Sequence, residues 1–564
     1  MVDDAVQEIQ VERASFWQPR SAATARLLLV VVTAICLIPF AGKPFNIDDP
    51  LFVWAAKHIA HHPLDPYGFP VIWYISATPM SAVTKNPPLA SYYMALIGPW
   101  TRWSEVPLHL AFLLPTIVVI LATYELARSL TSRPLLAALL TLAAPGFLVS
   151  ATSVMCDVPM LALWLLSILA WRRGLASNRA PYLILGSLLI GVCALTKYFG
   201  ACLLPLLLLY SLFKRRTLGT YALYLLLPAG ILVGYELWTR ALYGEGLLFG
   251  ALQYAQGMHS KNSSSLWGSL LVGLSFTGGC MLPVLLMAPL LFRKIWLVGG
   301  LALASLASVA LAWYWLDNAN QIANRNWEIA SLTVVICGGI FVLVLAASDA
   351  WHRLDAESVL LSAWVLGTFI FAALLNWTVN ARSVLPLIPA AAILIARRLD
   401  KLEGSRLVGR WVVAVPLAVS LAVSVWLASS DVSLANSARQ AASLIHAKTV
   451  SDSGKVFFAG HWGFQYYMEA QGAHPADLKR LDEIKFSDIV VLPGNNTNRF
   501  VFPQEVIDSS ESIEIDINHW ISPQRQEMGA GFYSSDIGPL PFAIGRVPRE
   551  SYELLHLKMP SPEP

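Results

Sequence analysis

The most constraining feature of this sequence is a series of apolar runs, most of them long enough to cross a lipid bilayer. A helix needs about 20 mainly apolar residues to cross the hydrocarbon core. Only 13% of the 564 residues are charged and 56% are hydrophobic, whereas a soluble domain carries about 25% charged residues. We therefore predict an all-α polytopic membrane protein with about thirteen transmembrane helices, over residues 23–41, 107–127, 134–152, 158–171, 181–198, 200–213, 220–239, 266–292, 296–316, 328–347, 357–376, 383–397 and 411–428.

The short apolar segment 88–103 is interrupted by proline, and periodicity does not say whether it crosses. Cytoplasmic loops of membrane proteins carry an excess of Lys and Arg. If 88–103 does not cross, one side holds Arg13, Arg20, Arg26, Arg128, Arg133, Arg172, Arg173, Arg179, Lys214, Arg215, Arg216, Arg293, Lys294, Arg353, Arg397, Arg398, Lys401, Arg406 and Arg410. The other side then holds only Lys43, Lys57, Lys85, Arg102, Lys197, Arg240, Lys261, Arg325 and Arg382, with the C-terminal region set aside. We therefore predict a re-entrant or interfacial helix at 88–103, a cytoplasmic N-terminus and an extracytoplasmic C-terminal region.

The chain changes character after about residue 430. The runs VFFAG (456–460) and DIVVLPG (488–494) are typical of short buried strands bounded by glycine. Residues 438–448 and 464–472 are predicted to be helices. The predicted organisation is a cytoplasmic segment 1–22, a transmembrane domain 23–430 whose first extracytoplasmic loop is 42–106, and a small extracytoplasmic α/β domain 431–564.

Two adjacent acids, Asp48 and Asp49, follow the first apolar run. Neighbouring carboxylates repel each other, so one of them is expected to have a raised pKa. Such a pair is compatible with proton abstraction from a hydroxyl or with metal binding. It is also compatible with helix capping, because Asp49 precedes Pro50. Capping accounts for one aspartate and not for two.

A predicted helix over residues 51–62 follows the acids and carries several histidines. His58 and His62 are four residues apart and therefore share one helix face, as metal ligands do. The alternative is an amphipathic helix that lies in the membrane interface. A divalent metal is left open, with His58 and His62 as its candidate ligands.

Three cations, Lys85, Lys197 and Arg382, are predicted at one membrane level on the less basic side. A single lysine there is typical of an interfacial anchor that extends to water. Three cations beside acids indicate an anionic ligand such as a lipid-linked phosphate. Asp157 lies on the same side, where the alternative to a functional role is capping of the following helix. Charges beside membrane spans are functional candidates because they are costly to bury there.

The order of these motifs resembles that of a known class of enzymes. An acidic pair is followed by KNPPLASYY, MCDVPML, ALTKYFGACLLP and NARSVLPLIPAAAIL. Over about residues 20–400 the chain resembles GT-C membrane glycosyltransferases, namely the dolichyl-phosphate-mannose protein mannosyltransferases and the bacterial aminoarabinose lipid A transferases. The resemblance implies a GT-C fold and inverting sugar transfer from a polyprenyl-phosphate donor to an acceptor hydroxyl at the outer membrane face.

The resemblance also implies roles for individual residues. Asp48 matches the family's general base, and Asp49 stands where the family usually has glutamate. Lys85, Lys197 and Arg382 match positions expected to bind the lipid phosphate, and Asp157 matches a second acid. The physics agrees, because a base on the acceptor and preorganised cations at the leaving phosphate are what this reaction requires.

The expected partners are a polyprenyl-phosphate-linked sugar, a lipid, glycan or protein acceptor, and membrane lipids. A bacterial inner membrane with a periplasmic C-terminal domain is the expected location.

The formal net charge of +3 gives no indication of nucleic acid binding. The main alternative is a transporter or lipid-carrier flippase, which typically shows internal repeats and broken helices near mid-membrane. The sequence identifies neither the sugar nor the acceptor.

Overall fold

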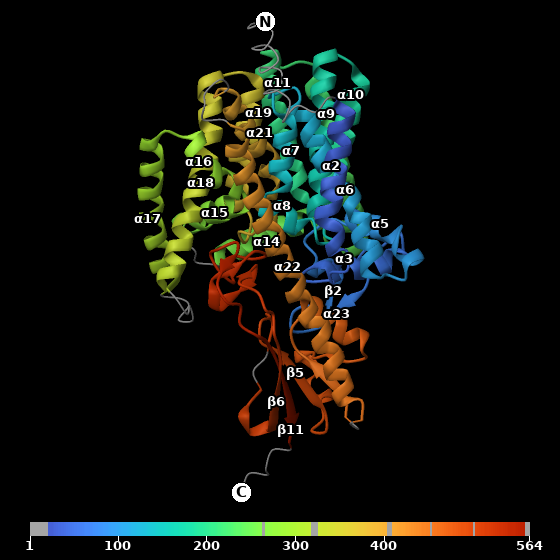
Figure 1. Ribbon diagram of the computed structural model, residues 1–564. Coiled ribbons are helices and arrows are strands. Elements are labelled where there is room, and N and C mark those ends of the chain that lie inside the picture. Colours follow the sequence, from blue (N-terminus) through green and yellow to red (C-terminus); the bar gives the residue numbers. More distant parts are fainter. Residues whose placement is uncertain are drawn as a thin grey trace, which may run out of the picture.

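The protein is a long bundle of helices with a small sheet domain at one end, as the computed structural model shows (Figure 1). The structure describes residues 21–261, 266–316, 325–402, 409–451, 454–499 and 502–558, so the predicted segment 1–22 lies almost wholly outside it. The helices are α2 (Ala22–Leu37), α3 (Asp49–Ile59), α4 (Met80–Val83), α5 (Leu89–Ala95), α6 (Glu105–Ala127), α7 (Pro134–Leu142), α8 (Pro145–Ser150), α9 (Asp157–Ser177), α10 (Ala180–Thr196), α11 (Leu203–Arg215), α12 (Tyr221–Tyr224), α13 (Leu226–Tyr243), α14 (Leu247–Lys261), α15 (Leu266–Cys280), α16 (Leu282–Leu291), α17 (Lys294–Leu316), α18 (Arg325–Arg353), α19 (Ala356–Ile370), α20 (Ala381–Val384), α21 (Ile388–Asp400), α22 (Arg410–Thr449) and α23 (Trp462–Ala470).

The predicted helical membrane fold is confirmed, but the number of spans is not. Within the described ranges nine helices are long and apolar enough to cross a membrane, or ten if α15 and α16, bent by 83°, form one span. Helix α10 is also apolar but shorter. Proline explains two missing spans, because Pro145 separates α8 from α7 and Pro386 lies in a 3₁₀ turn before α21. Segment 88–103 forms only α5 and a 3₁₀ turn, too short to span.

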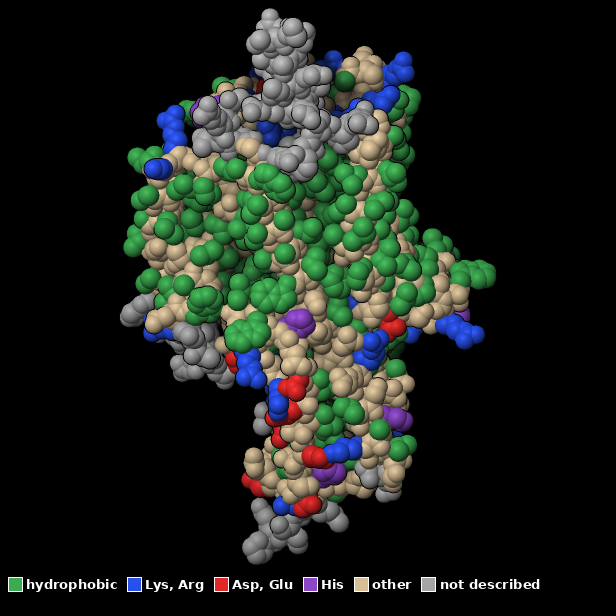
Figure 2. All heavy atoms as spheres, in the orientation of Figure 1, with side chains coloured by type: hydrophobic (Ala, Val, Ile, Leu, Met, Phe, Trp, Pro, Cys, Tyr) green, Lys and Arg blue, Asp and Glu red, His purple; other side chains and the backbone are tan. Residues whose placement is uncertain are grey.

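The surface of the bundle agrees with a membrane environment. Hydrophobic side chains cover its middle, while Lys and Arg side chains lie on both sides of this apolar band (Figure 2). Helix α17 stands at the edge of the bundle, and Ile295, Val298 and Leu306 on it are well exposed. An apolar surface of this extent indicates contact with lipid. The end of the bundle next to the sheet domain is called the domain end below, and the opposite end is called the far end.

The C-terminal domain is an α/β unit, as predicted. Its main sheet has the order β4-β3-β5-β11-β6, in which β3 runs parallel to β4 and β5, and β11 runs antiparallel to β5 and β6. Helix α22 continues from the bundle into this domain and packs against α23 and the sheet. The strands are β1 (Pro70–Val71), β2 (Thr78–Pro79), β3 (Val456–Phe458), β4 (His474–Pro475), β5 (Ile489–Pro493), β6 (Ile507–Ile515), β7 (Ile521–Ser522), β8 (Gln524–Arg525), β9 (Ala530–Gly531), β10 (Ala543–Ile544) and β11 (Glu550–Leu557).

The connection between β6 and β11 returns to the helical bundle. This segment, residues 520–545, is called the strap below. Its apolar side chains, among them Phe532 and Leu540, share one hydrophobic core with the bundle helices. Ser275 Oγ on α15 donates a hydrogen bond to the carbonyl of Pro539. The strap therefore joins the C-terminal domain to the domain end of the bundle, above the sheet in Figure 1.

Candidate active site

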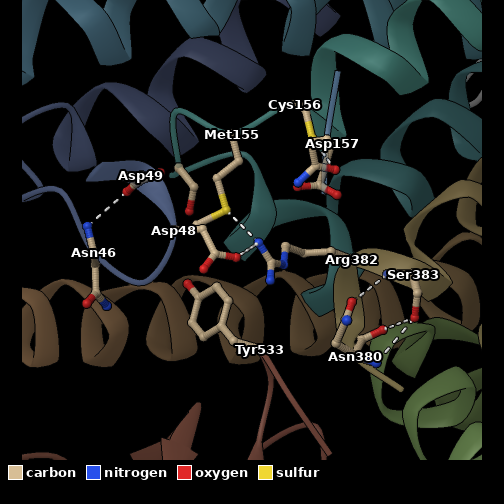
Figure 3. Close-up of polar contacts among 12 residues, drawn as sticks. Asn46, Asp48, Asp49, Met155, Cys156, Asp157, Asn380, Arg382, Ser383 and Tyr533 are labelled. Carbon is tan, nitrogen blue, oxygen red and sulfur yellow. Dashed lines mark hydrogen bonds and ion pairs between the residues drawn. The ribbon is translucent and has the colours of Figure 1, made fainter. Parts of the chain in front are cut away.

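An aspartate and an arginine from distant parts of the sequence form an ion pair at the domain end (Figure 3). Arg382 Nη1 lies 2.8 Å from Asp48 Oδ2, and the two side chains are 15% and 27% exposed. Asn380 and Ser383 form a capping box that starts the short helix α20 and so places Arg382. The Asp48 carboxylate makes no capping hydrogen bond to α3. The pair is therefore partly open to a ligand.

Asp49 points away from its neighbour and is fully buried (Figure 3). One carboxylate oxygen accepts a hydrogen bond from the backbone N–H of Asn46 and the other from that of Val154, both at 3.0 Å. It is the first residue of α3, not its cap, so the capping alternative fails for both aspartates. Burial raises the pKa of Asp49 to about 7, although Lys43 and the two backbone hydrogen bonds oppose the shift. The raised pKa thus comes mainly from burial and not from repulsion by Asp48.

The second predicted acid, Asp157, pairs with the predicted cation Lys197. Lys197 Nζ lies 2.5 Å from Asp157 Oδ1, with the acid almost fully buried. Asp157 begins α9 without capping it, so the capping alternative is wrong here as well. This pair lies near the first one. Burial opposes ionisation of Arg382, but Asp48 and Asp157 together raise its pKa above the usual value.

Lys85 takes part in neither of these ion pairs. Its amine donates a hydrogen bond to the carbonyl of Ala82 at 2.7 Å and lies 5.0 Å from the ring centroid of Tyr254 on α14. Burial lowers the pKa of Lys85, with Glu245 acting in the opposite direction. The structure therefore brings two of the three predicted cations into ion pairs and leaves Lys85 beside an aromatic ring.

The two candidate metal ligands, His58 and His62, lie close to each other. The rings of His58 and His62 are 4.6 Å apart, and His58 also packs on Phe69 at 4.8 Å. Among the described residues, no group of three or more His, Cys, Asp or Glu side chains is arranged to hold a metal ion. His58 lies in α3, which packs against α5 and α23, whereas His62 lies beyond the end of this helix at Ile59, so the predicted helix 51–62 is shorter than expected.

A buried polar network lies next to the Asp48–Arg382 pair. This network was not predicted from the sequence. Lys43 Nζ lies 2.5 Å from Asp431 Oδ2 and also donates to the hydroxyl of Thr152. Asp431 accepts a second hydrogen bond, at 2.7 Å, from the hydroxyl of Tyr533 in the strap. Asp431 could have been found, because it follows the last apolar run at the same predicted level as Asp48. No local signal marks Tyr533.

The segment that contains Lys85, Asp157 and Lys197 has known relatives. Residues 85–238 match the dolichyl-phosphate-mannose-protein mannosyltransferase family. This match confirms the resemblance of the chain to that family over the matched residues. Asp48 and Arg382 lie outside them, so the structure alone connects the two parts. The chain is thus a membrane protein similar to glycosyltransferases of the GT-C class.

Solved structures give weaker similarities. An oligosaccharyltransferase from Archaeoglobus fulgidus, tethered to an acceptor peptide, is 13% identical with a TM-score of 0.49; the similarity covers 82% of this chain but 64% of that one, less than two thirds of its length. ArnT from Cupriavidus metallidurans bound to undecaprenyl phosphate is 15% identical with a TM-score of 0.43, covering 84% and 94% of the two chains. The same ArnT in the apo state gives a TM-score of 0.40. No curated protein sequence matches the chain.

The residues of this site have complementary chemical capacities. Asp48 offers a partly exposed carboxylate, which can accept a proton. Arg382 Nε is buried and has no hydrogen-bond partner in the described structure. The Nε atoms of Arg172 and Arg397 at the far end are buried without a partner among the described residues as well, so this feature alone does not indicate a ligand. The partly exposed Arg382 guanidinium can take an anion directly beside the Asp48 carboxylate.

Proposed function

We propose that the protein is an inverting glycosyltransferase that moves a sugar from a polyprenyl-phosphate donor to an acceptor hydroxyl at the outer face of the membrane. The observation that carries this proposal is the partly exposed Asp48–Arg382 pair at the domain end, with the Asp157–Lys197 pair near it. The match of residues 85–238 to a mannosyltransferase family supports the reaction class.

In this reaction Asp48 is the general base. The carboxylate takes the proton of the acceptor hydroxyl while the hydroxyl oxygen attacks the anomeric carbon. The bond from that carbon to the phosphate oxygen breaks, and its electron pair leaves with the polyprenyl phosphate. Attack from the face opposite the phosphate inverts the anomeric configuration and needs no covalent enzyme intermediate.

The cations stabilise the leaving phosphate. Arg382 carries five N–H donors, of which Nη1 is bound to Asp48 and to the sulfur of Met155. The remaining donors are suited to phosphate oxygens, as guanidinium groups generally are. Lys197 supplies a second positive charge, and Lys85 a third from the side of Tyr254. Preorganised charge of this kind lowers the barrier because it needs no rearrangement as the phosphate leaves.

The two buried acids have supporting roles in this proposal. Asp49, with both oxygens on backbone N–H groups, holds the turn that presents Asp48 against the loop before α9. Asp157 holds the Lys197 amine in place. The domain end is then the outer side of the membrane and the far end the cytoplasmic side, in agreement with the excess of Lys and Arg in the predicted cytoplasmic loops.

A product analysis separates this function from that of a transporter. The purified protein in lipid vesicles is supplied with polyprenyl-phosphate-linked sugars and a membrane extract that contains acceptors. The proposal predicts that donor is consumed, that free polyprenyl phosphate forms, and that the transferred sugar has the inverted configuration. Movement of intact donor across the vesicle membrane without cleavage would instead identify a flippase.

A further inference from the structure

A tyrosine of the strap lies against the Asp48–Arg382 pair (Figure 3). The guanidinium carbon of Arg382 is 5.7 Å from the ring centroid of Tyr533. Contact of an arginine with an aromatic face is attractive and leaves the in-plane N–H groups free for hydrogen bonds. The ring therefore holds the guanidinium without occupying the donors that a phosphate needs.

The hydroxyl end of the same tyrosine is fixed in the buried network. Its Oη donates to Asp431, and Asp431 in turn pairs with Lys43; the aspartate and the lysine are fully buried. Lys43 continues the connection to Thr152 and Ser153, in the loop that also supplies Val154 to Asp49. A buried network of charged hydrogen bonds has little freedom, so the ring of Tyr533 has a defined position.

The backbone beside Tyr533 is fixed to the chain that leads into Arg382. Ala381 N–H donates to the carbonyl of Phe532 at 2.9 Å, and Ser535 N–H donates to the carbonyl of Val379 at 2.8 Å. Val379 N–H also donates to the hydroxyl of Ser535. The strap therefore contacts the backbone just before the arginine through residues 532–535, and the guanidinium of Arg382 through the ring of Tyr533.

We propose that the strap is part of the active site and that Tyr533 is the positioning residue that holds Arg382 toward the donor phosphate, an inference that rests on the proposed function. An unsupported arginine side chain has many rotamers and loses entropy when it binds. A tyrosine ring that is held in place by its own hydroxyl restricts the arginine before the donor binds, and so reduces the entropy lost on binding. The contribution of the C-terminal domain to the reaction is then to complete the phosphate subsite.

Binding of undecaprenyl phosphate to the full-length protein in detergent tests this proposal, with undecaprenol, which lacks the phosphate, as the ligand control. Tyr533→Leu removes the ring and is expected to raise the Kd for undecaprenyl phosphate about tenfold, as for loss of a desolvated cation–π contact. Tyr533→Phe keeps the ring but loses the hydrogen bond to Asp431 that fixes it, so its Kd is expected to lie between those of wild type and Tyr533→Leu. If Tyr533→Leu does not accumulate in membranes, Tyr533→Met takes its place with the same expectation.

Tyr552 provides a matched control variant. It is also 4% exposed and also hydrogen-bonded through its hydroxyl, to Ser437, but it lies in the core of the main sheet. Tyr552→Leu is expected to lower the thermal midpoint comparably to Tyr533→Leu while leaving the Kd unchanged. A rise in Kd of equal size in both variants would overturn the proposal, because the effect would then be general destabilisation.

A double variant tests whether Tyr533 acts through Arg382. In an Arg382→Ala background, Tyr533→Leu is expected to add no further loss of affinity. An additional tenfold loss in that background would overturn the positioning role. If wild-type protein binds undecaprenyl phosphate no better than undecaprenol, the proposed function itself fails. A third outcome is that wild type binds undecaprenyl phosphate and Arg382→Ala weakens this binding, but Tyr533→Leu does not. In that case only the inference about the strap fails.

Discussion

Charged side chains cluster at both ends of the bundle, but the two clusters are built differently. At the far end, Glu357 on α19 contacts Arg172, Lys214 and the hydroxyl of Tyr210. Asp349 and Asp400 likewise have two or more partners each from neighbouring helices. At the domain end, Asp48 and Asp157 each pair with one cation.

The difference indicates what each cluster does. An acid with several partners connects helix ends, which is a structural task. Buried ion pairs contribute little net stability, because desolvation offsets most of their attraction. The Asp48–Arg382 and Asp157–Lys197 pairs therefore contribute little to the stability of the fold. We therefore propose that the charges at the domain end serve function rather than stability.

The largest loss of donor affinity is expected for Arg382→Ala. Hydrogen bonds to charged groups are each worth about 1.5–3 kcal/mol, so the loss of two phosphate contacts should raise the Kd for undecaprenyl phosphate about a hundredfold or more. Titration of the purified variant in detergent measures this change. An unchanged Kd would mean that the charges at the domain end do not bind the donor phosphate, so the two ends of the bundle would not differ in function.

A smaller loss of affinity is expected for Lys197→Ala, about tenfold. The lysine contributes one charge, and its removal also leaves Asp157 buried without a partner at the edge of the phosphate site. Lys197→Arg is the matched variant, since it keeps the charge and should retain most of the affinity. The same binding assay decides, and equal Kd values for wild type, Lys197→Ala and Lys197→Arg would contradict the assignment.

The domain end should also show a pH dependence of stability that originates from Asp49. Its folded-state pKa of about 7 lies above the 3.8 typical of an unfolded chain, so the folded state binds the proton more tightly. The stabilisation from this proton is complete below about pH 4 and is lost as the pH rises through about 7, by at most about 1.4 kcal/mol per pH unit. Thermal midpoints across this range should fall less steeply for Asp49→Asn than for wild type. Parallel curves would show that Asp49 is ionised throughout.

The smallest functional effect is expected at the far end. Glu357→Gln keeps the shape of the side chain but weakens its ion pairs with Arg172 and Lys214. We expect a lower thermal midpoint, equivalent to about 1–3 kcal/mol, with donor affinity and turnover within about twofold of wild type. A turnover loss as large as that of Lys197→Ala would mean that the two clusters are functionally alike.

Some of this organisation could be predicted from sequence and some could not. Apolar runs and the distribution of basic residues report local properties, so the helical fold, the α/β domain and the level of Asp48, Asp157 and Arg382 were predictable. The number of spans was not, because prolines such as Pro145 interrupt runs that are apolar enough to cross.

Contacts between residues far apart in the sequence could not be predicted either. The burial of Asp49 depends on a backbone N–H of Val154, and nothing in the residues around Asp49 reports that contact. The approach of Tyr533 to Arg382 depends on the strap folding back onto the bundle. Neither side chain has a local pattern that differs from that of an ordinary loop residue.

In the proposed reaction Asp48 removes the proton from the acceptor, and the transfer rate of Asp48→Asn at saturating donor tests this role most directly. Asparagine keeps the shape and cannot act as a base, so the rate is expected to fall about 10²–10⁴-fold. The Kd for undecaprenyl phosphate should stay the same or decrease, because Arg382 loses a competing carboxylate. Transfer by Asp48→Asn at the wild-type rate would show that Asp48 is not the general base.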